Sequence, residues 1–589
     1  MAEKIRKKEL FGNVEIEGIY RETRRPAPQA DKKAREGKEE NWDGLEEKSL
    51  EGAGHGFCSP FNQRTYLAED GILCEQDVPV TLRDGIVIYT DIYRPVGQTG
   101  IPAIVAWSYF GKRPGDGFDE WQIIGVPPGT VSRMAKFEAP DPAYWCRHGY
   151  AVANVDPRGV GHSQGNVNMF GTQDGRDGYD FIEWIATRHW CNGKVSMGGN
   201  SGVAMTQWRI AAEQPPHLAC IAPWEGTGDL YRESLYEGGI PALGFNDFIV
   251  GSLTGTGYVD DTAAMAMEHP FLDAYWEDKI PKWRNIRIPV STTVCWNHFH
   301  LRGSMEGFRR IRSTKKWLRA HREFEWPDTF GTAGILDLKL FYDRYLKDIR
   351  NGWELTPRVR LEVMDAYEYD FQTNRAEREF PLARTQYRKL YVDAAKGTLS
   401  LVPVTVESKI SYEAEKGSTT FDIRFEEDTE ITGFMKLRLW VEAAGNDDMD
   451  LFIAIRKLDE QGNWLPVNVL GEPHPGAWGK MRVSRRELDE KLSTDFQPVQ
   501  AHRRDQKLKP GEIVPVDIEI WPHSRIWHKG QQLRVLVSGH YIREGWFEPF
   551  SWELNNKGKH VIHSGGKYDS YLQVPVIPPR YRAGDYVYR

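Results

Sequence analysis

The chain has 589 residues, more than one hydrophobic core accommodates, so we expect about two to four domains. Its formal net charge of −8 provides no strong cationic field, which argues against nucleic acid as the main partner. No apolar run approaches the length of about 18 residues that a membrane helix needs, and the charged start MAEKIRKKELFGN has no apolar signal region. The six cysteines form no CxxC pair. We therefore expect a cytoplasmic protein without a membrane segment, structural zinc or disulfide framework.

The N-terminal half alternates strand and helix patterns. Residues 1–75 are charged and irregular, and we interpret them as an N-terminal arm that is solvated over 21–48. Residues 78–95 predict a hairpin that turns at Asp84-Gly85. Buried strands are predicted at 101–107 and 150–155, an amphipathic helix at 179–188, and further strands at 220–223 and 289–296. This alternation predicts an α/β domain with a mostly parallel sheet, in two parts, 76–224 and 288–375.

Two further segments differ from this region in composition and hydrophobic pattern. Residues 225–287 are rich in Gly, aromatic residues and short helical pieces, and we expect them to form a helical cap. From 376 to 589, short alternating runs are separated by turn signals, which predicts a β-sandwich of the jelly-roll type. The runs that carry this prediction are 434–443, 450–458, 514–522, 532–539 and 571–578.

The motif Gly-Gly-Asn-Ser-Gly at 198–202 is the strongest functional signal in the sequence. It follows the strand pattern Lys194-Val195-Ser196-Met197 and precedes a helical segment, 203–213. A Gly-x-Ser turn between strand and helix is typical of a nucleophile elbow, in which small neighbours leave the serine hydroxyl exposed. Ser201 would then lie at a helix N-terminus, where backbone amides stabilise an oxyanion. By itself the motif also fits a glycine-rich turn without catalytic function.

Several segments in a fixed order resemble the cocaine esterase / X-Pro dipeptidyl-peptidase (CocE/NonD) family of serine hydrolases. They are VTLRDGIVIYTDIYRP, DPRGVGHSQG, WCNGK, the serine elbow, APWEGTGDLYRE and, near the C-terminus, LKPGEIVPVDIEIWPHSRIWHKGQQLRVLVSG. The resemblance extends over about residues 75–580. It implies an α/β-hydrolase domain, a helical cap and a C-terminal jelly roll, which agrees with the segments described above.

The resemblance implies a catalytic triad whose members follow in the order Ser, Asp, His. Ser201 takes the nucleophile position, and the segment 315–326 makes His321 the base. Without a gap, the aspartate position of the family falls on His298 in the segment 295–308. A histidine cannot supply the negative charge that an imidazole base needs beside it. Asn297 or His298 would still accept a hydrogen bond, and a carboxylate from Glu306, Glu323 or Asp247 would be an alternative.

The oxyanion site departs from the family in the same way. Phe110 stands where the family carries a tyrosine hydroxyl, so we expect the Gly202 amide and the neighbouring Tyr109 to act as donors. We expect the substrate pocket to contain Trp107, Phe110, Trp224, Glu225, Tyr231 and Asn297. For Glu225, capping of the following helix is an equal alternative. The pair His298-x-His300 also fits a metal site, but no third ligand has a suitable spacing, so we expect no metal and no cofactor.

Three functions remain open from the sequence. The first is a serine hydrolase that cleaves a carboxylic ester or amide through an acyl-Ser201 intermediate. The second is a non-hydrolytic enzyme of the same fold that uses His298 and His321 as proton-transfer groups on a specialised metabolite. The third is a catalytically silent binding protein. In each case we expect a small-molecule ligand, and the jelly roll is a potential homodimer contact.

Overall fold

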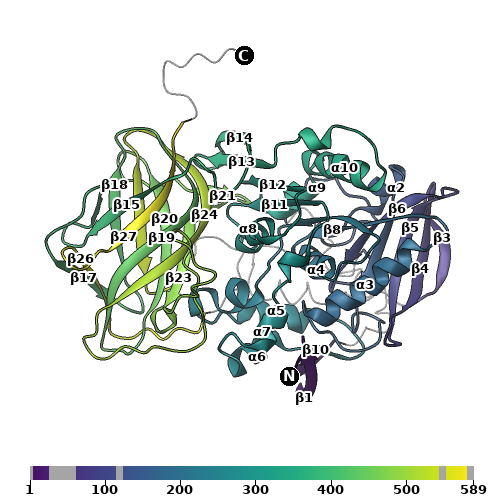
Figure 1. Cartoon of the computed structure of the whole chain (residues 1–589), viewed down its shortest axis with the longest axis horizontal. Helices are drawn as coiled ribbons and strands as arrows, with labels where there is room; N and C mark the ends of the chain where they lie inside the picture. The colour runs from purple at the N-terminus through teal and green to yellow at the C-terminus, as the bar shows by residue number, and fades with distance from the viewer. Residues whose placement is uncertain (1–3, 25–60, 115–123, 543–551, 580–589) are drawn as a thin grey trace, which may run out of the picture.

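The computed structural model describes residues 4–24, 61–114, 124–542 and 552–579, and the following account concerns these ranges. An α/β part and a β-sandwich part lie side by side along the longest axis of the molecule (Figure 1). Within the described ranges, no helix combines the length and the apolar character needed to cross a membrane. The predicted fold class, an α/β-hydrolase with a C-terminal β-sandwich, is confirmed.

A mixed sheet forms the centre of the α/β part. Its strands from β7 to β13 run parallel, and antiparallel strands extend it at both edges. The spatial order is β3 (Arg64–Glu69), β4 (Ile72–Thr81), β5 (Val87–Pro95), β7 (Ala151–Asp156), β6 (Ile101–Trp107), β8 (Cys191–Asn200), β9 (Leu218–Trp224), β11 (Val290–Cys295), β12 (Lys316–His321), β13 (Val359–Met364) and β14 (Asp370–Glu377). The predicted hairpin is confirmed, because β4 and β5 pair antiparallel around Gly85, whose φ is +87°.

Helices cover both faces of this sheet. On β6, Ala103, Val105 and Trp107 pack in the core beneath α3 (Thr172–Ala186) and α4 (Ser201–Ala212). Ile104 instead packs in the core beneath α2 (Pro142–Arg147) and α10 (Thr332–Leu346). A strand that is buried on both faces needs a continuous apolar run, which is why IPAIVAW was recognisable in the sequence. Two further helices, α8 (Leu301–Arg310) and α9 (Glu325–Phe330), follow β11 and β12.

The segment between β9 and β11 forms the predicted helical cap. It consists of η2 (Tyr231–Leu235), η3 (Glu237–Gly239), α5 (Gly244–Ser252), β10 (Tyr258–Asp260), α6 (Thr262–Glu268), α7 (Ala274–Asp278) and η4 (Trp283–Asn285). Its aromatic side chains account for much of its composition, since Tyr231, Tyr275 and Trp276 are fully buried in one hydrophobic cluster. The cap is therefore a packed unit with its own core.

The interpretation of residues 1–75 as an irregular arm is wrong for its first part and for its last, since β3 and the start of β4 belong to the central sheet. Residues in β1 (Lys4–Phe11) and β2 (Val14–Glu22) form an antiparallel hairpin, and β2 pairs with β10 of the cap. Phe11 and Tyr20 are buried against the cap, while the other side chains of the hairpin are largely charged. The high charge concealed the strand pattern in the sequence. Residues 25–48 of the predicted arm lie outside the described residues.

The C-terminal part is a β-sandwich around one large aliphatic core. One sheet contains β15 (Gln386–Asp393), β27 (Tyr571–Ile577), β19 (Thr429–Ala444), β24 (Val514–Trp527), β26 (Lys559–Ser564) and β17 (Ser408–Glu413). The other contains β18 (Ser418–Arg424), β25 (Gln532–Ser538), β20 (Asp450–Leu458) and β23 (Ala477–Arg482). The short elements are β16 (Thr398–Ser400), β21 (Val467–Val469), β22 (Glu472–His474), η5 (Trp353–Leu355) and η6 (Val483–Arg485). Each of the five alternating runs in the sequence corresponds to a strand.

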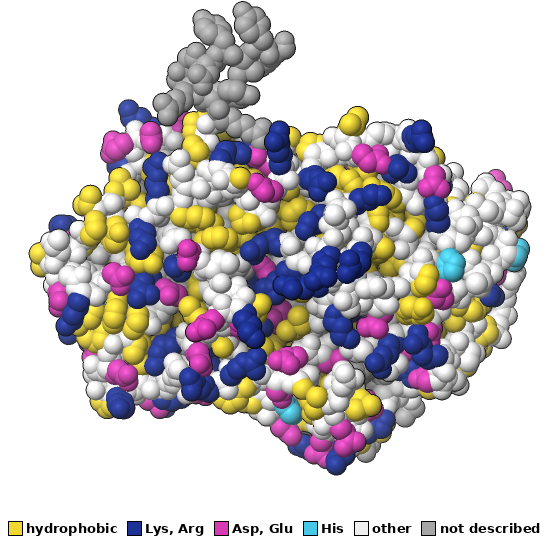
Figure 2. Space-filling view, in the orientation of Figure 1, with side chains coloured by type: hydrophobic (Ala, Val, Ile, Leu, Met, Phe, Trp, Pro, Cys, Tyr) yellow, Lys and Arg dark blue, Asp and Glu magenta, His cyan; other side chains and the backbone are white. Residues whose placement is uncertain are grey.

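The surface carries both signs of charge. Figure 2 shows Lys and Arg side chains gathered across the middle of one face, where the two parts of the molecule meet. Asp and Glu side chains surround this band, and hydrophobic patches lie between the charged groups. This face is therefore mixed in charge, in keeping with the modest net charge of −8.

A buried ion pair within the cap is hydrogen-bonded to Met169 of the α/β part. Lys279 Nζ lies 2.5 Å from Asp260 Oδ2 and donates to the Met169 carbonyl at 2.7 Å, and both charged side chains are fully buried. We expect Lys279→Met to lower the free energy of unfolding by about 3–5 kcal/mol, because the Asp260 charge would remain buried without its partner. Chemical denaturation measures this loss. Lys282→Met is the matched control, since the Lys282–Glu213 pair is exposed, and equal losses in both variants would contradict the expectation.

Candidate active site

Ser201 occupies the strained corner between β8 and α4. Its φ is +52°, in the left-handed region that costs a non-glycine residue about 1–3 kcal/mol. Two backbone hydrogen bonds hold the corner: Ser201 N donates to the Glu225 carbonyl at 3.0 Å, and Asn200 N donates to the Glu138 carbonyl at 3.3 Å. The segments after β9 and before α2 thus fix the turn from both sides. This geometry is that of a nucleophile elbow.

The glycines on both sides of Ser201 are required by close contacts. A Cβ atom on Gly199 would lie 2.5 Å from the Glu138 carbonyl oxygen, and the φ of Gly199 is +125°. A Cβ atom on Gly202 would lie 2.9 Å from the Phe110 ring. The small residues that marked the motif in the sequence therefore allow neighbouring segments to approach the elbow.

The imidazole next to the serine belongs to His300. Its Nε2 lies 3.1 Å from Ser201 Oγ, and its Nδ1 lies 2.6 Å from Thr227 Oγ1. If the Nδ1–H donates to Thr227, Nε2 is free to accept the proton of the Ser201 hydroxyl. Ser201, His300 and Thr227 therefore form a chain of hydrogen bonds in which an uncharged hydroxyl stands at the place of the usual carboxylate.

His300 is held in its neutral form. Burial lowers the pKa of His300 well below its usual 6.5, and the neighbouring His298 lowers it further. His300 is also the N-cap residue of α8, where the helix dipole disfavours an added positive charge. A neutral imidazole at hydrogen-bond distance from a hydroxyl satisfies the geometric requirement for a general base.

The structure corrects the assignment of the base to His321. His321 Nδ1 lies 2.9 Å from the Glu323 carbonyl, while Nε2 lies 3.2 Å from Glu225 Oε1 and 3.3 Å from Asp328 Oδ2. Burial lowers the pKa of His321, but Asp328 and Glu225 outweigh this effect and raise it overall. His321 is thus a buried ion-pair centre that links the ends of β9, β12 and α9. It does not stand beside the nucleophile.

His298, His300 and Glu325 form a cluster whose potential metal-binding atoms lie within 4.8 Å of one another. His298 Nδ1 accepts the His300 amide at 3.1 Å, so the proton of the neutral ring is on Nε2, which faces Glu325 Oε1 at 3.3 Å. A protonated ring nitrogen cannot ligate a metal. Burial lowers the pKa of His298 to about 4, which keeps the ring neutral. These contacts favour a buried His298–Glu325 contact over a metal site, although Glu325 is the third potential ligand that the sequence spacing did not show.

Two buried carboxyls lie close to the serine. Glu325 accepts from Asn200 Nδ2 at 2.8 Å, and Glu138 follows the loop that packs on the elbow. Burial and the proximity of Glu325 raise the pKa of Glu138 well above its usual value, although the nearby Ser201 hydroxyl opposes this. Burial and Glu225 raise the pKa of Glu325 likewise. The nucleophile is therefore surrounded by carboxyl groups that are difficult to ionise.

The prediction that Tyr109 lines the oxyanion site is wrong. Its hydroxyl donates to Asp174 Oδ2 at 2.7 Å and accepts from the Phe170 amide at 3.0 Å, within a hydrophobic cluster. Trp107 Nε1 donates to the other oxygen of Asp174 at 2.7 Å, so both side chains stabilise the start of α3. The Phe110 ring lies against Gly202.

The remaining predicted pocket residues have other partners. Trp224 is buried in the core under α10, and the Tyr231 hydroxyl donates to the Pro270 carbonyl inside the cap. Asn297 lies between Met364 Sδ and His523 Nε2, each at 3.3 Å. Glu225 contacts the elbow, because its carbonyl accepts Ser201 N and its carboxylate lies near His321.

The three acids considered as substitutes for the triad aspartate have other partners. Glu306 forms ion pairs with Arg309 and Arg310, and Asp247 forms an ion pair with Arg21. The Glu323 carboxylate is exposed and lies 4.0 Å from Arg322.

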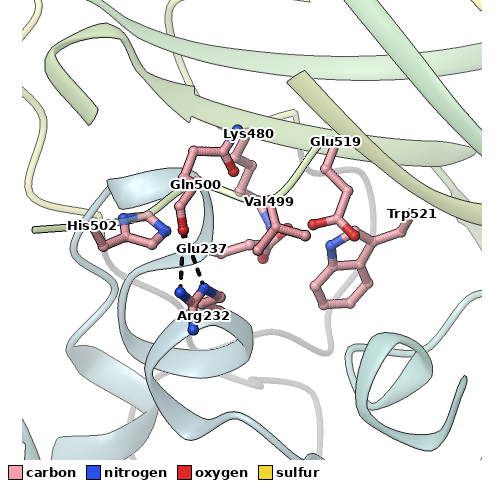
Figure 3. Close-up of a pocket in the computed structure, with 9 residues that line it drawn as sticks. Arg232, Glu237, Lys480, Val499, Gln500, His502, Glu519 and Trp521 are labelled. Carbon is pink, nitrogen blue, oxygen red and sulfur yellow. Dashed lines mark hydrogen bonds and ion pairs between the residues drawn. The ribbon is translucent and has the colours of Figure 1, made fainter. Parts of the chain in front are cut away.

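A separate cavity of about 20 Å³ lies between the cap and the sandwich (Figure 3). Its charged side chains satisfy one another: Arg232 donates to the Gln500 carbonyl at 3.2 Å, and Glu237 forms an ion pair with Lys480. Glu519, on the same wall, lies 3.2 Å from Arg302 of α8. The cavity therefore lies among ion pairs between the cap, α8 and β24. Those made by Arg302 hold α8, which begins at His300, between the cap and β24.

Sequence reasoning missed four members of this site: His300, Thr227, Glu138 and Glu325. His300 was visible in the His298-x-His300 pair, but the gapless alignment assigned the triad position to His298. Thr227 lies in APWEGTGDLYRE, which carried the family resemblance. Glu138 and Glu325 had no signal of their own, because single acidic residues in loops are common.

Comparisons with known proteins agree with this architecture. Residues 84–262 match the family model of the X-Pro dipeptidyl-peptidase (S15 family), and residues 351–573 match that of the X-Pro dipeptidyl-peptidase C-terminal non-catalytic domain. A crystal structure of a CocE/NonD family hydrolase from Staphylococcus aureus is 34% identical, with a TM-score of 0.81 over 86% of this chain and 94% of that chain.

Two more distant proteins are also similar. Cocaine esterase from Rhodococcus sp. (strain MB1 Bresler) is 25% identical over 604 residues, which cover 85% of this chain and 98% of the esterase. An aminopeptidase from a marine sediment archaeon of the Thaumarchaeota is 15% identical, with a TM-score of 0.62 over 85% of this chain and 96% of that one. The latter likeness concerns the fold alone.

The close approach of the Glu138 carbonyl to Gly199 leads to a testable prediction. We expect Gly199→Ala to destabilise the protein by about 2–4 kcal/mol and to displace Ser201, because the new methyl group would meet the Glu138 carbonyl and a left-handed φ disfavours alanine. Thermal unfolding and the rate of fluorophosphonate labelling measure the two effects. Gly97→Ala is the matched control, since Gly97 has a φ of +70° but no atom within 4 Å of its Cβ position. A Gly199 variant that behaves like this control would contradict the role of the contact.

Proposed function

Since the chain belongs to the CocE/NonD family of hydrolases, we propose that it cleaves a carboxylic ester or amide through an acyl-Ser201 intermediate. The observation that carries the proposal is the hydrogen bond between Ser201 Oγ, at a strained elbow, and Nε2 of a neutral His300. Nucleophile and base are thus in contact before substrate arrives, as covalent catalysis requires.

The proposed reaction proceeds in two halves. Ser201 Oγ attacks the carbonyl carbon while its proton passes to His300 Nε2, and the carbonyl electron pair moves onto oxygen to form an oxyanion. The intermediate collapses with cleavage of the bond to the leaving group, which takes the proton from His300. Water then repeats the sequence on the acyl-serine, with His300 again as base. The amide of Gly202, in the first turn of α4, supports the oxyanion because it has no intrahelical acceptor.

Thr227 determines how strongly the base is supported. Its hydroxyl orients His300 but supplies no negative charge to the imidazolium that forms during attack. Replacement of the triad aspartate by a neutral residue costs about 10⁴ in turnover in serine proteases. We therefore propose a specialised rather than a fast, general esterase.

The non-hydrolytic alternative has less support. It requires His298 to exchange protons with a substrate, but His298 is fully buried, and its two ring nitrogens face the His300 amide and Glu325. Its low pKa leaves it neutral across the physiological range. His321, the other histidine of that alternative, is engaged with two carboxylates.

Substitution of the two histidines distinguishes their roles. We expect Ser201→Ala to abolish fluorophosphonate labelling and His300→Ala to lower kcat/KM for p-nitrophenyl acetate by about 10²–10⁴, the usual contribution of a general base. His321→Gln should retain labelling and instead lower the melting temperature, because the buried Glu225 side chain would lose the imidazole beside it, while Asp328 would keep its ion pair with Arg319. A folded His321→Gln protein without labelling, or a fully active His300→Ala protein, would refute these assignments.

The decline of kcat/KM at low pH depends on the pKa of the catalytic base. His300 acts as a base only when neutral, and its pKa is well below 6.5, so it stays neutral as the pH falls through that value. We expect kcat/KM for p-nitrophenyl acetate to remain on its plateau below pH 6.5 and to decline only at distinctly lower pH. The measurement is a pH series with unfolding monitored in parallel. A decline centred at or above 6.5 would indicate that a different group is the base.

A further inference from the structure

We propose that the neutral carboxyl group of Glu138 donates a hydrogen bond to the oxyanion of the tetrahedral intermediate, beside the amide of Gly202. The inference rests on the acyl-Ser201 chemistry proposed above and assigns its second oxyanion donor. In the segment between β6 and α2, Glu138 Oε2 and the Phe110 ring both lie within 4 Å of the position that a Cβ atom on Gly202 would occupy.

The first support is the position of Glu138 at the elbow. Its carbonyl accepts the Asn200 amide at 3.3 Å, and its carboxyl lies close enough to the Ser201 hydroxyl for that hydroxyl to affect its pKa. Glu138 Oε2 lies 3.6 Å from the point that a Cβ atom of Gly202 would occupy. The carboxyl therefore lies at the first turn of α4, where the oxyanion would form.

The second support is an unused hydrogen-bonding position. Glu138 is 2% exposed, and its Oε2 has no hydrogen-bond partner in the part of the chain that the structure describes. Its φ is +61°, a left-handed conformation that is costly for a residue with a side chain. Buried polar atoms without a partner and strained residues are both concentrated at functional sites. A substrate oxygen at the nucleophile would supply the missing partner.

The third support is the protonation state. Burial raises the pKa of Glu138 well above its usual value, as does the carboxyl of Glu325 on α9; the nearby polar groups of Ser201 and Trp326 and the charge of Lys136 oppose the shift without reversing it. The Lys136 ammonium is itself directed at the Gly111 carbonyl, 2.5 Å away. The surroundings of Glu138 therefore favour its protonated, carboxylic acid form. An ionised carboxylate would repel the oxyanion, whereas the acid has an O–H to donate.

The proposed step involves no proton transfer from Glu138. As the Ser201 oxygen forms its bond to the carbonyl carbon, the π electron pair moves to the carbonyl oxygen, and the proton of Ser201 goes to His300. The Glu138 O–H remains intact and strengthens its hydrogen bond as negative charge develops. When the C–O bond to the leaving group breaks, the electron pair returns and the hydrogen bond weakens. Loss of one such donor typically lowers kcat by about 10²–10³.

Three variants of Glu138 test the role, with p-nitrophenyl acetate as substrate. Glu138→Ala removes the donor, and we expect kcat to fall about 10²–10³-fold with a smaller change in KM. Glu138→Gln keeps an N–H donor of similar size, and we expect it to restore at least a tenth of the wild-type kcat. Glu138→Asp keeps the acid but shortens it, and should resemble the alanine variant. Glu415→Gln, an exposed position in the sandwich, controls for the loss of a carboxyl elsewhere.

The pH profile separates this role from a structural one. Wild-type kcat/KM should fall on the alkaline side, as the pH rises through the pKa of Glu138 and the donor proton is lost. Glu138→Gln should lack this decline, because its amide does not titrate. Circular dichroism and thermal unfolding verify that each variant is folded.

The outcomes identify which proposal fails. A Glu138→Gln protein as slow as Glu138→Ala would show that the carboxylate is required, and a Glu138→Ala protein with wild-type kcat would show that Glu138 is not a donor; either result overturns the inference. Absence of fluorophosphonate labelling at Ser201 in the wild type would instead refute the acyl-serine chemistry itself.

Discussion

The hydrogen bond from the Ser201 amide to the Glu225 carbonyl holds the corner on which the site depends. A residue with a side chain does not remain at φ +52° by its own preference, so the strain must be balanced by the surrounding structure. Glu225 closes the corner from β9, and the Glu138 carbonyl closes it from the loop before α2. Each of these segments also carries a carboxyl group into the site. The contacts that build the elbow and those that surround the nucleophile are therefore made by the same residues.

The base reaches the serine through a different part of the fold. His300 caps α8, and Arg302 on that helix lies 3.1 Å from Glu233 of the cap and 3.2 Å from Glu519 of the sandwich. The distance between His300 and Ser201 thus depends on the packing of all three structural parts. The cap and the sandwich contribute to the active site by fixing α8. This explains why buried charges are concentrated at their junction, where each unpaired charge would be costly.

The two buried histidines near the elbow have opposite pKa shifts because their neighbours differ. His321 has two carboxylates as neighbours, and its pKa is raised; His300 has a hydroxyl and another imidazole as neighbours, and its pKa is lowered. Only a neutral imidazole accepts a proton, so the electrostatic environment selects His300 as the base. The same reasoning applies to Glu138, whose pKa is raised by burial and by Glu325 despite the charge of Lys136, which favours the protonated form that the proposed donor role requires.

The sequence by itself determined what depends on local pattern. The alternating runs of the sandwich, the continuous apolar strand 101–107 and the elbow at Ser201 were predicted, because strand burial and a tight turn are encoded by neighbouring residues. The charged N-terminal hairpin was not predicted from the sequence. Its strands are stabilised by pairing with β10 and by the burial of Phe11 and Tyr20, which the local pattern does not show. The tertiary structure alone decided between His321 and His300, which are 21 positions apart in the sequence yet both close to the elbow. Which histidine lies beside Ser201 depends on how the loops after the strands converge at the edge of the sheet. Which histidine is neutral depends on the charges buried around each imidazole.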